Sequence, residues 1–326
     1  MTTAADTADP VSRVAADVER LCANIGHVIQ GKPDVVRNAV ICLLAEGHLL
    51  LEDVPGTGKT SLARALASSV ALSWHRVQFT PDLLPSDVTG VSIYNQATQQ
   101  FEFKQGPVFA NIVVADEINR ASPKTQSALL EVMEEGTLTA DGVGYEMPRP
   151  FMVVATQNPI DMEGTYVLPE AQLDRFLMKL TVGYPSADAE AEILRTQKHG
   201  STVTQLTPVL TAADVVAMID VVRHIEVAPA LEQYIVAIAA ATRAMSELRL
   251  GVSPRGSLAL LRAARAAAVA AGRSYVLPDD VKAMAPVVLA HRVILQPDAE
   301  LQGRTGTELV SRAVQSVQVP RAVAAG

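Results

Sequence analysis

The sequence predicts an α/β protein in which a doubly wound parallel sheet carries inserted β-hairpins and is followed by an all-α domain. Five short runs rich in Val, Ile and Leu alternate with helical patterns through about the first 180 residues. Such runs are typical of parallel strands covered on both faces. The composition agrees, because apolar residues make up 49% of the 326 residues and aromatic residues only 4%, which favours helices packed on a sheet over an all-β fold.

The predicted strands end in polar residues. They are HLLLED ending at Asp53, HRVQFT ending at Thr80, IVVADE ending at Glu117, FMVVATQ ending at Gln157 and FLMKLTVGYP ending at Pro185. Helices are expected to begin near Lys59 and Pro123. In an open parallel sheet, ligands bind at the carboxyl ends of the strands, so the polar residues there are the first candidates for a site.

Two segments with alternating apolar residues interrupt this order and predict β-hairpins: GVSIYNQATQQFEFKQGPVF and GTLTADGVGYEMPRP, the latter turning around Asp141 and Gly142. After GYPSADAE the patterns are helical only, with Ser186 as an expected helix cap ahead of Asp188 and Glu190. Further helices are expected near Asp214, Pro229, Pro254 and Pro278. The predicted domains are 1–27, a tail and leading helix; 28–184, the α/β core; and 185–326, the helical domain.

Charge and composition argue against several classes of function. The 27 basic and 35 acidic residues give a net charge of −8, which argues against a surface for duplex phosphate, and the single Trp74 gives no stacking stripe, so no nucleic-acid partner is expected. No apolar run reaches membrane-spanning length without a charge or an amide, so no membrane insertion is expected. Two cysteines, no signal peptide and six scattered histidines indicate a cytoplasmic protein without a histidine metal site.

The segment DVPGTGKT nearly matches the phosphate-loop motif G-x-x-x-x-G-K-[ST]. Gly56 and Gly58 let backbone N–H groups turn towards phosphate oxygens, Lys59 can reach the outer phosphates, and Thr60 can bind Mg²⁺. Asp53 stands where the motif has its first glycine, and its carboxylate would have to point away from the phosphates. An ordinary turn is the alternative interpretation of this segment alone.

Other strand ends supply the remaining candidates. Asp116 can hold Mg²⁺ and Glu117 can polarise the attacking water, whereas a simple turn is the alternative. Asn158 follows Gln157 in ATQNP, where an amide that orients water and a structural Asn-Pro turn are equally good interpretations.

Two arginines are candidates for phosphate contacts. Arg175, in LPEAQLDRF, carries planar charged donors suited to a transferring phosphoryl group, although a single arginine is more often a surface residue. Arg255, in SPRGSLALL, lies in the first turn of a predicted helix, where a cation opposes the helix dipole unless a phosphate or solvent compensates.

In this order the motifs resemble the AAA+ ATPases, and within them the MoxR family of the helix-2-insert group. The most specific stretches are FTPDLLPSDVTG, GPVFANIVVADEINRASPKTQSALLEVMEEG, ATQNP and LPEAQLDRF. The resemblance extends from about Val28 to the end of the helical domain. It implies that the fold is a P-loop AAA+ core followed by a helical lid, with the first hairpin as the helix-2 insert and the second as the hairpin before sensor 1.

The resemblance also assigns roles to residues. It implies Walker A at DVPGTGKT, Walker B at Asp116 and Glu117, sensor 1 at Asn158, an arginine finger at Arg175 and sensor 2 at Arg255. The catalytic residues would be Glu117, Asn158 and Arg175, and the Mg²⁺ ligands Thr60 and Asp116. The implied ATP contacts are Gln30, Pro55, Gly56, Thr57, Gly58, Lys59, Thr60, Ser61 and Arg255. The resemblance gives Arg120, within the same stretch, no role.

The implied function is Mg²⁺-dependent ATP hydrolysis by a ring, usually of six subunits, coupled to chaperone-like remodelling or maturation of other proteins. A partner with a von Willebrand factor A domain is expected, and the client protein is not identified. Three alternatives remain open at this point: a motor like the magnesium-chelatase I subunit, a nucleic-acid motor, and a binding module that uses ATP only to assemble.

Overall fold

The computed structural model describes residues 9–54, 56–158, 165–196 and 206–320, without the side chains of residues 192, 193 and 196. Within this part the chain forms two compact units. One is built from Leu21–Phe176 and Leu180–Val216, and the other from the residues up to Arg20, from Leu177–Lys179 and from Ala217 onwards. The domain boundaries expected at 27/28 and 184/185 stay predictions.

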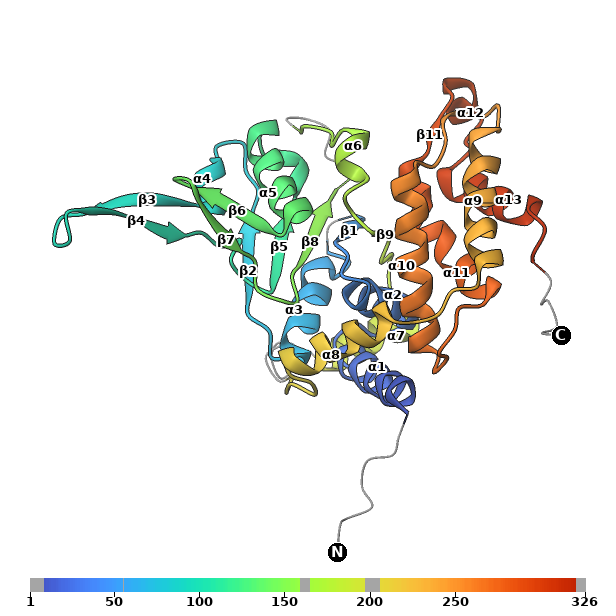
Figure 1. Cartoon of the computed structure of the whole chain (residues 1–326), viewed down its shortest axis with the longest axis horizontal. Helices are drawn as coiled ribbons and strands as arrows, with labels where there is room; N and C mark the ends of the chain where they lie inside the picture. Colours follow the sequence, from blue (N-terminus) through green and yellow to red (C-terminus); the bar gives the residue numbers. More distant parts are fainter. Residues whose placement is uncertain (1–8, 55, 159–164, 197–205, 321–326) are drawn as a thin grey trace, which may run out of the picture. The chain divides into compact units, whose positions relative to one another are not determined.

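A five-stranded sheet has the order β2-β5-β8-β1-β9 (Figure 1), and its first four strands belong wholly to the first unit. The strands are β1 (Leu49–Glu52), β2 (Trp74–Gln78), β5 (Ile112–Asp116), β8 (Met152–Gln157) and β9 (Met178–Leu180). β2, β5, β8 and β1 pair in parallel in that sequence. All five strands were predicted, and their non-sequential order confirms the doubly wound fold class.

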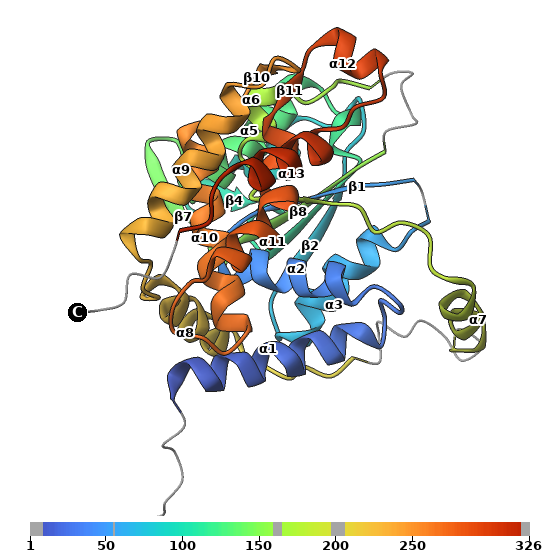
Figure 2. The same ribbon diagram turned by 90° about the vertical axis from the view of Figure 1, so that its right-hand side faces the viewer.

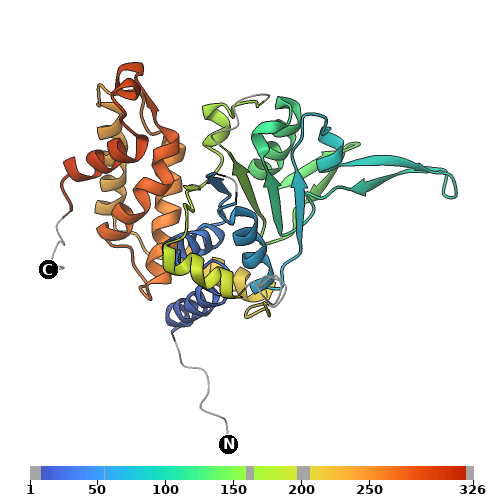
Figure 3. The ribbon, with the colours of Figure 1, turned by 180° about the vertical axis from the view of Figure 1, so that it is seen from behind.

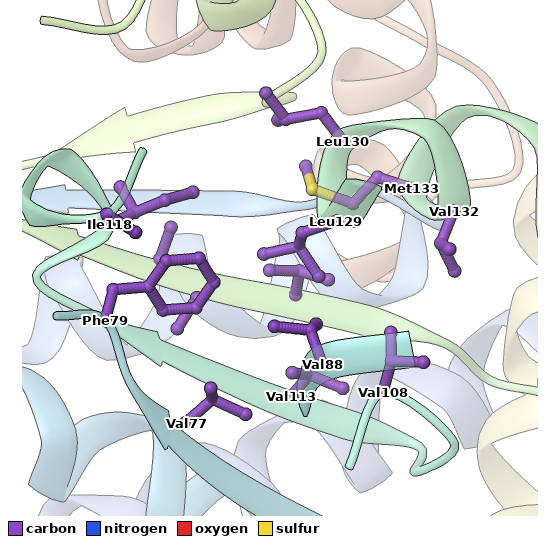
Figure 4. Packing of buried hydrophobic residues seen from close by; sticks show 14 of the residues in the cluster. Val77, Phe79, Val88, Val108, Val113, Ile118, Leu129, Leu130, Val132 and Met133 are labelled. Atoms are coloured by element: carbon purple, nitrogen blue, oxygen red, sulfur yellow. The ribbon is translucent and has the colours of Figure 1, made fainter. Parts of the chain in front are cut away.

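The main core lies on one face of this sheet. Val77, Val113 and Val153, from three neighbouring strands, pack there with residues of helix α5 (Pro123–Glu135). Figure 4 shows Val77 and Val113 together with Leu129 and Met133 of this helix. Side chains alternate along a strand, so the residues before and after each of these valines point to the opposite face. That face carries α3 (Lys59–Ser69). Both helices begin at the predicted residues. Ser122 caps α5 by accepting a hydrogen bond from Thr125 N at 3.4 Å.

Both predicted hairpins are present (Figure 3). β3 (Gly90–Asn95) pairs with β4 (Gln100–Gln105), and β6 (Thr137–Ala140) pairs with β7 (Val143–Glu146). Asp141 and Gly142 adopt positive φ values of 51° and 79°, as a tight hairpin turn requires. Ser92 donates a hydrogen bond to the Asp141 carboxylate, and the rings of Phe103 and Tyr145 lie 4.7 Å apart, so the two hairpins contact each other.

Within its described residues the first unit contains four further helices, of which α2 is largely buried. They are α2 (Pro33–Leu44), α4 (Pro85–Thr89), α6 (Glu170–Leu173) and α7 (Ala187–Thr196). Ser186 caps α7 as predicted, accepting from Ala189 N at 3.3 Å. α8 (Ala212–Arg223) spans the point where the chain passes into the second unit.

The second unit is mostly helical (Figure 2). Its helices are the first part of α1 (Pro10–Gly26), α9 (Pro229–Arg243), α10 (Pro254–Ala270), α11 (Pro278–Leu289), α12 (Pro297–Leu301) and α13 (Gly306–Ser316). The all-α expectation was wrong in one respect, because β10 (Leu248–Leu250) pairs with β11 (Ile294–Leu295). Strands of three and two residues are too short to show a period of two.

No helix in the described part of the chain is both long and apolar enough to cross a bilayer.

The core predicts a matched pair of stability effects. Leu129→Ala removes a fully buried α5 side chain and should cost about 2–5 kcal/mol of unfolding free energy, because it leaves a cavity. Leu84→Ala, at a side chain that is 59% exposed in the same unit, should change the unfolding free energy by at most about 0.5 kcal/mol. Denaturant unfolding followed by the fluorescence of Trp74, which lies in β2 of this unit, measures both. Equal losses in the two variants would contradict this assignment of the core.

Candidate functional site

The parallel register brings the polar strand ends together at one edge of the sheet. Glu52 of β1 is opposite Gln157 of β8, and Gln78 of β2 is opposite Asp116 of β5. Strand β8 lies between β1 and β5, so the phosphate loop after β1 and the acidic pair after β5 flank its carboxyl end. This is the edge at which the sequence predicted a ligand.

The loop between β1 and α3 has the backbone that a phosphate loop needs. Gly56 and Gly58 have φ values of 84° and 89°, a region that favours glycine. Thr57 Oγ1 donates to Val54 O at 3.1 Å, which holds the turn, and α3 begins directly afterwards at Lys59. Thr60 and Ser61 follow in its first turn, where unpaired backbone N–H groups favour an anion. Pro55, predicted to contact ATP, lies outside the described residues.

The Lys59 ammonium group is held by backbone carbonyl oxygens. Its Nζ donates to Asp53 O, to Val54 O at 3.2 Å and to Gln157 O at 3.4 Å. Burial lowers the pKa of Lys59, because the charged form loses hydration, while Asp53 and Asp116 oppose this effect. None of these partners neutralises the positive charge by direct contact, so the ammonium group remains suited to an anionic ligand.

Asp116 is buried at 5% exposure and joins three elements. Its Oδ2 accepts from Thr60 Oγ1 of α3 at 3.0 Å, and its Oδ1 accepts from Thr156 Oγ1 of β8 at 2.7 Å. Arg76 of β2 adds an ion pair, with Nε 2.7 Å from Oδ2. The Thr60 hydroxyl and the Asp116 carboxylate therefore offer two neighbouring oxygen atoms, the ligand type that Mg²⁺ prefers.

Glu117 lies directly after β5 in a left-handed backbone conformation, with φ 54°. Its backbone N donates to Thr156 Oγ1 at 2.9 Å. Its carboxylate oxygen Oε2 accepts from Gln78 Nε2 at 3.0 Å and from Arg120 Nη1 at 2.9 Å. The site thus gives Arg120, which the sequence left without a role, a position beside Glu117.

Sequence reasoning missed Arg76, Gln78 and Thr156. Their signal was the period of two along the strands: Arg76 and Gln78 flank Val77, and Thr156 follows Ala155, so that all three alternate with residues of the main core. They consequently lie on the same face as Asp116. Recognising this requires the strand order, which places β2 and β8 on either side of β5.

Asn158 and Gln30 also lie near this edge. Asn158 is buried directly after β8. Gln30 lies in the segment before α2, and its Oε1 is buried without a hydrogen-bond partner. That segment borders the phosphate loop, since a Cβ atom placed on Gly58 would lie 3.9 Å from Ile29 Cδ1. An unsatisfied buried acceptor is costly, so Gln30 fits a ligand that presents an amino group.

The structure does not bring Arg175 to the acidic pair of the same chain. Arg175 forms an ion pair with Glu134, with Nη2 and Oε2 2.8 Å apart. Glu134 is near the end of α5, which begins shortly after Glu117. At 1.5 Å per residue, Glu134 lies about 17 Å along the helix from Pro123. Arg175 is therefore remote from Glu117 within one chain.

Arg255 belongs to the second unit and is exposed in the first turn of α10. The helix starts there because Ser253 accepts from Gly256 N at 3.2 Å. Among the described residues no group of three or more His, Cys, Asp or Glu side chains could hold a metal ion, so a cation at Thr60 and Asp116 would need phosphate or water as further ligands.

A phosphate loop and an acidic pair on a parallel sheet with this strand order define a P-loop ATPase of the AAA+ class. Residues 48–178 match the family model of the "ATPase family associated with various cellular activities (AAA)", and residues 240–313 match the "AAA lid domain". The chain belongs to the MoxR family of these AAA+ ATPases.

The similarity to relatives extends over nearly the whole chain. The chain is 42% identical to Chaperone MoxR1 of Mycobacterium tuberculosis, over 94% of this chain and 84% of that protein. It is 50% identical to the YeaC protein of Bacillus subtilis, over 91% of this chain and 93% of that one. The solved structure of a putative ATPase from Cytophaga hutchinsonii superposes with a TM-score of 0.88 at 37% identity, covering 96% and 97% of the two chains.

The hydroxyl of Thr156 generates a stability prediction. Thr156→Val keeps the side-chain shape but leaves the buried Asp116 carboxylate and the Glu117 N–H each without one partner, so the unfolding free energy should fall by about 1–3 kcal/mol. Thr156→Ser keeps the hydroxyl and should lose less. Thr139→Val, at an exposed position of β6, is the matched control. Denaturant unfolding compares the three, and a Thr156→Val loss no larger than that of the control would contradict a stabilising role of these hydrogen bonds.

Proposed function

We propose that this protein hydrolyses ATP with Mg²⁺ and uses the energy to remodel or mature other proteins. The observation that carries the proposal is the convergence of Lys59, Thr60, Asp116 and Glu117 at one edge of the sheet. Membership of the MoxR family and the name of the relative Chaperone MoxR1 support the remodelling role.

Lys59 and the first turn of α3 bind the phosphates in this proposal. The Lys59 ammonium group exchanges its carbonyl partners for the outer phosphate oxygens, which carry more negative charge. Thr60 and Asp116 hold Mg²⁺, and the ion, when bound, neutralises charge on the phosphate oxygens. The partner-less Oε1 of Gln30 accepts from the amino group of adenine.

Glu117 accepts a proton from the attacking water, and Asn158 orients that water without adding charge. Gln78 and Arg120 both hold Glu117 Oε2, so they fix the direction of the carboxylate. The contact with Arg120 is also an ion pair, with Nη1 2.9 Å from Oε2. Arg255 is proposed to contact the phosphates from the helical unit.

Arg175 is proposed to act on the site of a neighbouring subunit. Its ion pair with Glu134 keeps it about a helix length from Glu117 of its own chain. An arginine that stabilises the transition state can raise phosphoryl-transfer rates by about 10³–10⁵. A site completed in trans requires assembly, so we propose a ring, with six subunits as the expected number. A von Willebrand factor A domain partner and a cytoplasmic location complete the proposal.

Two single substitutions separate binding from hydrolysis. Lys59→Ala should weaken ATP binding by at least about tenfold, since it removes the cation at the phosphates. Glu117→Gln should bind ATP within about threefold of the wild type and lose at least about 10²-fold in turnover, because the amide is no base. Fluorescent-nucleotide titration and phosphate release measure the two effects. Wild-type turnover by Glu117→Gln would remove this residue from the base role.

Mixing two inactive variants tests the shared site. Lys59→Ala subunits lack a working phosphate loop but keep Arg175, whereas Arg175→Ala subunits keep the loop and lack the arginine. If Arg175 acts in trans, a mixture should recover phosphate release at neighbours where an intact loop meets an intact arginine. A mixture of Glu117→Gln and Lys59→Ala subunits is the control. No site in that mixture has both Lys59 and Glu117, so it should stay inactive. A mixture as inactive as either variant alone, despite co-assembly by light scattering, would contradict the trans arrangement.

A further inference from the structure

Asp53 replaces the first glycine of the general phosphate-loop motif, and both oxygen atoms of its carboxylate have backbone partners. Oδ1 accepts from Val54 N at 2.7 Å, and Oδ2 accepts from Gly183 N. The residue is only 8% exposed. A glycine at position 53 has no atoms that could make either contact, so the departure from the motif adds a connection between two distant parts of the chain.

Gly183 lies in the connection between β9 and α7, with φ 68°. A Cβ atom placed on Gly183 would lie 3.3 Å from Lys32 Nζ. Further along the same segment, Ala189 of α7 approaches Gly31, where an added Cβ would lie 2.9 Å from Ala189 Cβ. Residues 183–189, here called the closing segment, therefore lie against residues 31–32, directly after Gln30.

The backbone of Asp53 connects to the opposite side of the site. Its carbonyl oxygen accepts from Lys59 Nζ, and its N–H donates to Gln157 O at 3.2 Å. One residue thus contacts the phosphate-binding lysine through its carbonyl group and the closing segment through its carboxylate. The 53–54 peptide contains both the Asp53 carbonyl group and the Val54 N–H, and this N–H donates to Asp53 Oδ1. A change in the hydrogen bond from Lys59 to that carbonyl group therefore acts directly on the turn.

We propose that Asp53 is a positioning residue that couples occupancy of the phosphate loop to the closing segment. The coupling rests on the proposed nucleotide site at Lys59. When Lys59 turns from the Asp53 carbonyl oxygen to phosphate, the 53–54 peptide loses one of its anchors. The carboxylate on the same residue then changes its hold on Gly183, so the state of the nucleotide reaches the segment that leads into α7.

Amide hydrogen exchange on the full-length protein tests this coupling at Gly183. In the nucleotide-free protein Asp53→Ala should raise the exchange rate of the Gly183 amide at least about tenfold, because the amide loses the Asp53 carboxylate as its hydrogen-bond acceptor. Asp53→Asn, with one acceptor oxygen in place of two, should give an intermediate rate. Addition of Mg·ADP should change the Gly183 rate at least about threefold in the wild type and leave it unchanged in Asp53→Ala.

Glu52→Gln is the matched control, since it removes a negative charge one residue away and near Lys59. The Glu52 carboxylate accepts from Gln157 Nε2 at 3.1 Å, and the wild-type exchange rate at Gly183 is expected in this variant. Wild-type protection of amides in α5 shows that each variant is folded. An equal rise in Glu52→Gln, or no rise in Asp53→Ala, would overturn the proposal.

The failure of this inference is distinguishable from failure of the proposed function. Binding of ADP is measured separately by fluorescence titration. A wild type that binds Mg·ADP without any change in Gly183 exchange overturns the coupling and leaves the nucleotide site intact. A wild type that binds neither ADP nor ATP overturns the proposed function and with it the coupling, whatever the exchange rates of the nucleotide-free variants.

Discussion

The buried carboxylate of Asp116 is the interaction on which the rest of the site depends. A buried carboxylate is costly unless its oxygens are paired, so its partners must stay in place for the unit to be stable. Thr60 and Thr156 supply hydroxyl groups from α3 and β8, and Arg76 supplies a guanidinium group from the edge strand β2. Thr156 also accepts from the Glu117 amide. One carboxylate thus fixes the relative positions of the lysine-bearing helix, the central strands and the proposed base.

The two faces of the sheet carry different side chains near the carboxyl ends of the strands. On one face, small apolar residues of three strands pack against α5 in a continuous core. On the other face, the same strands present Arg76, Gln78 and Thr156 beside α3. Helix α5 begins shortly after the acidic pair, and Glu134 near its end forms an ion pair with Arg175. Its length sets the separation between the base and the arginine of one chain, which is the reason for proposing that the two meet only between subunits.

Most of the fold could be predicted from the sequence, because the signals are local. The five strands are apolar runs of ordinary length, both hairpins have alternating patterns, and α9, α10 and α11 begin at the prolines that marked them. The Asp141-Gly142 turn shows positive φ values for the same local reason. The β10–β11 pair was missed, since two or three residues carry no period and their pairing joins positions more than 40 residues apart. Proline and glycine residues indicated where helices and turns begin, but they gave no information about which strands pair.

By itself the sequence determined the phosphate loop, the acidic pair and the family, because these are contiguous motifs whose chemistry follows from residue type. Tertiary structure alone decided which distant side chains join them. Gln78 reaches Glu117 only because β2 lies beside β5, and Glu134 meets Arg175 only because α5 ends where the chain enters β9. In the sequence Asp53 is only a departure from the phosphate-loop motif, whereas the structure shows that its carboxylate accepts a hydrogen bond from Gly183 N. Contacts between residues far apart in the chain depend on strand order and register, and no local pattern encodes these.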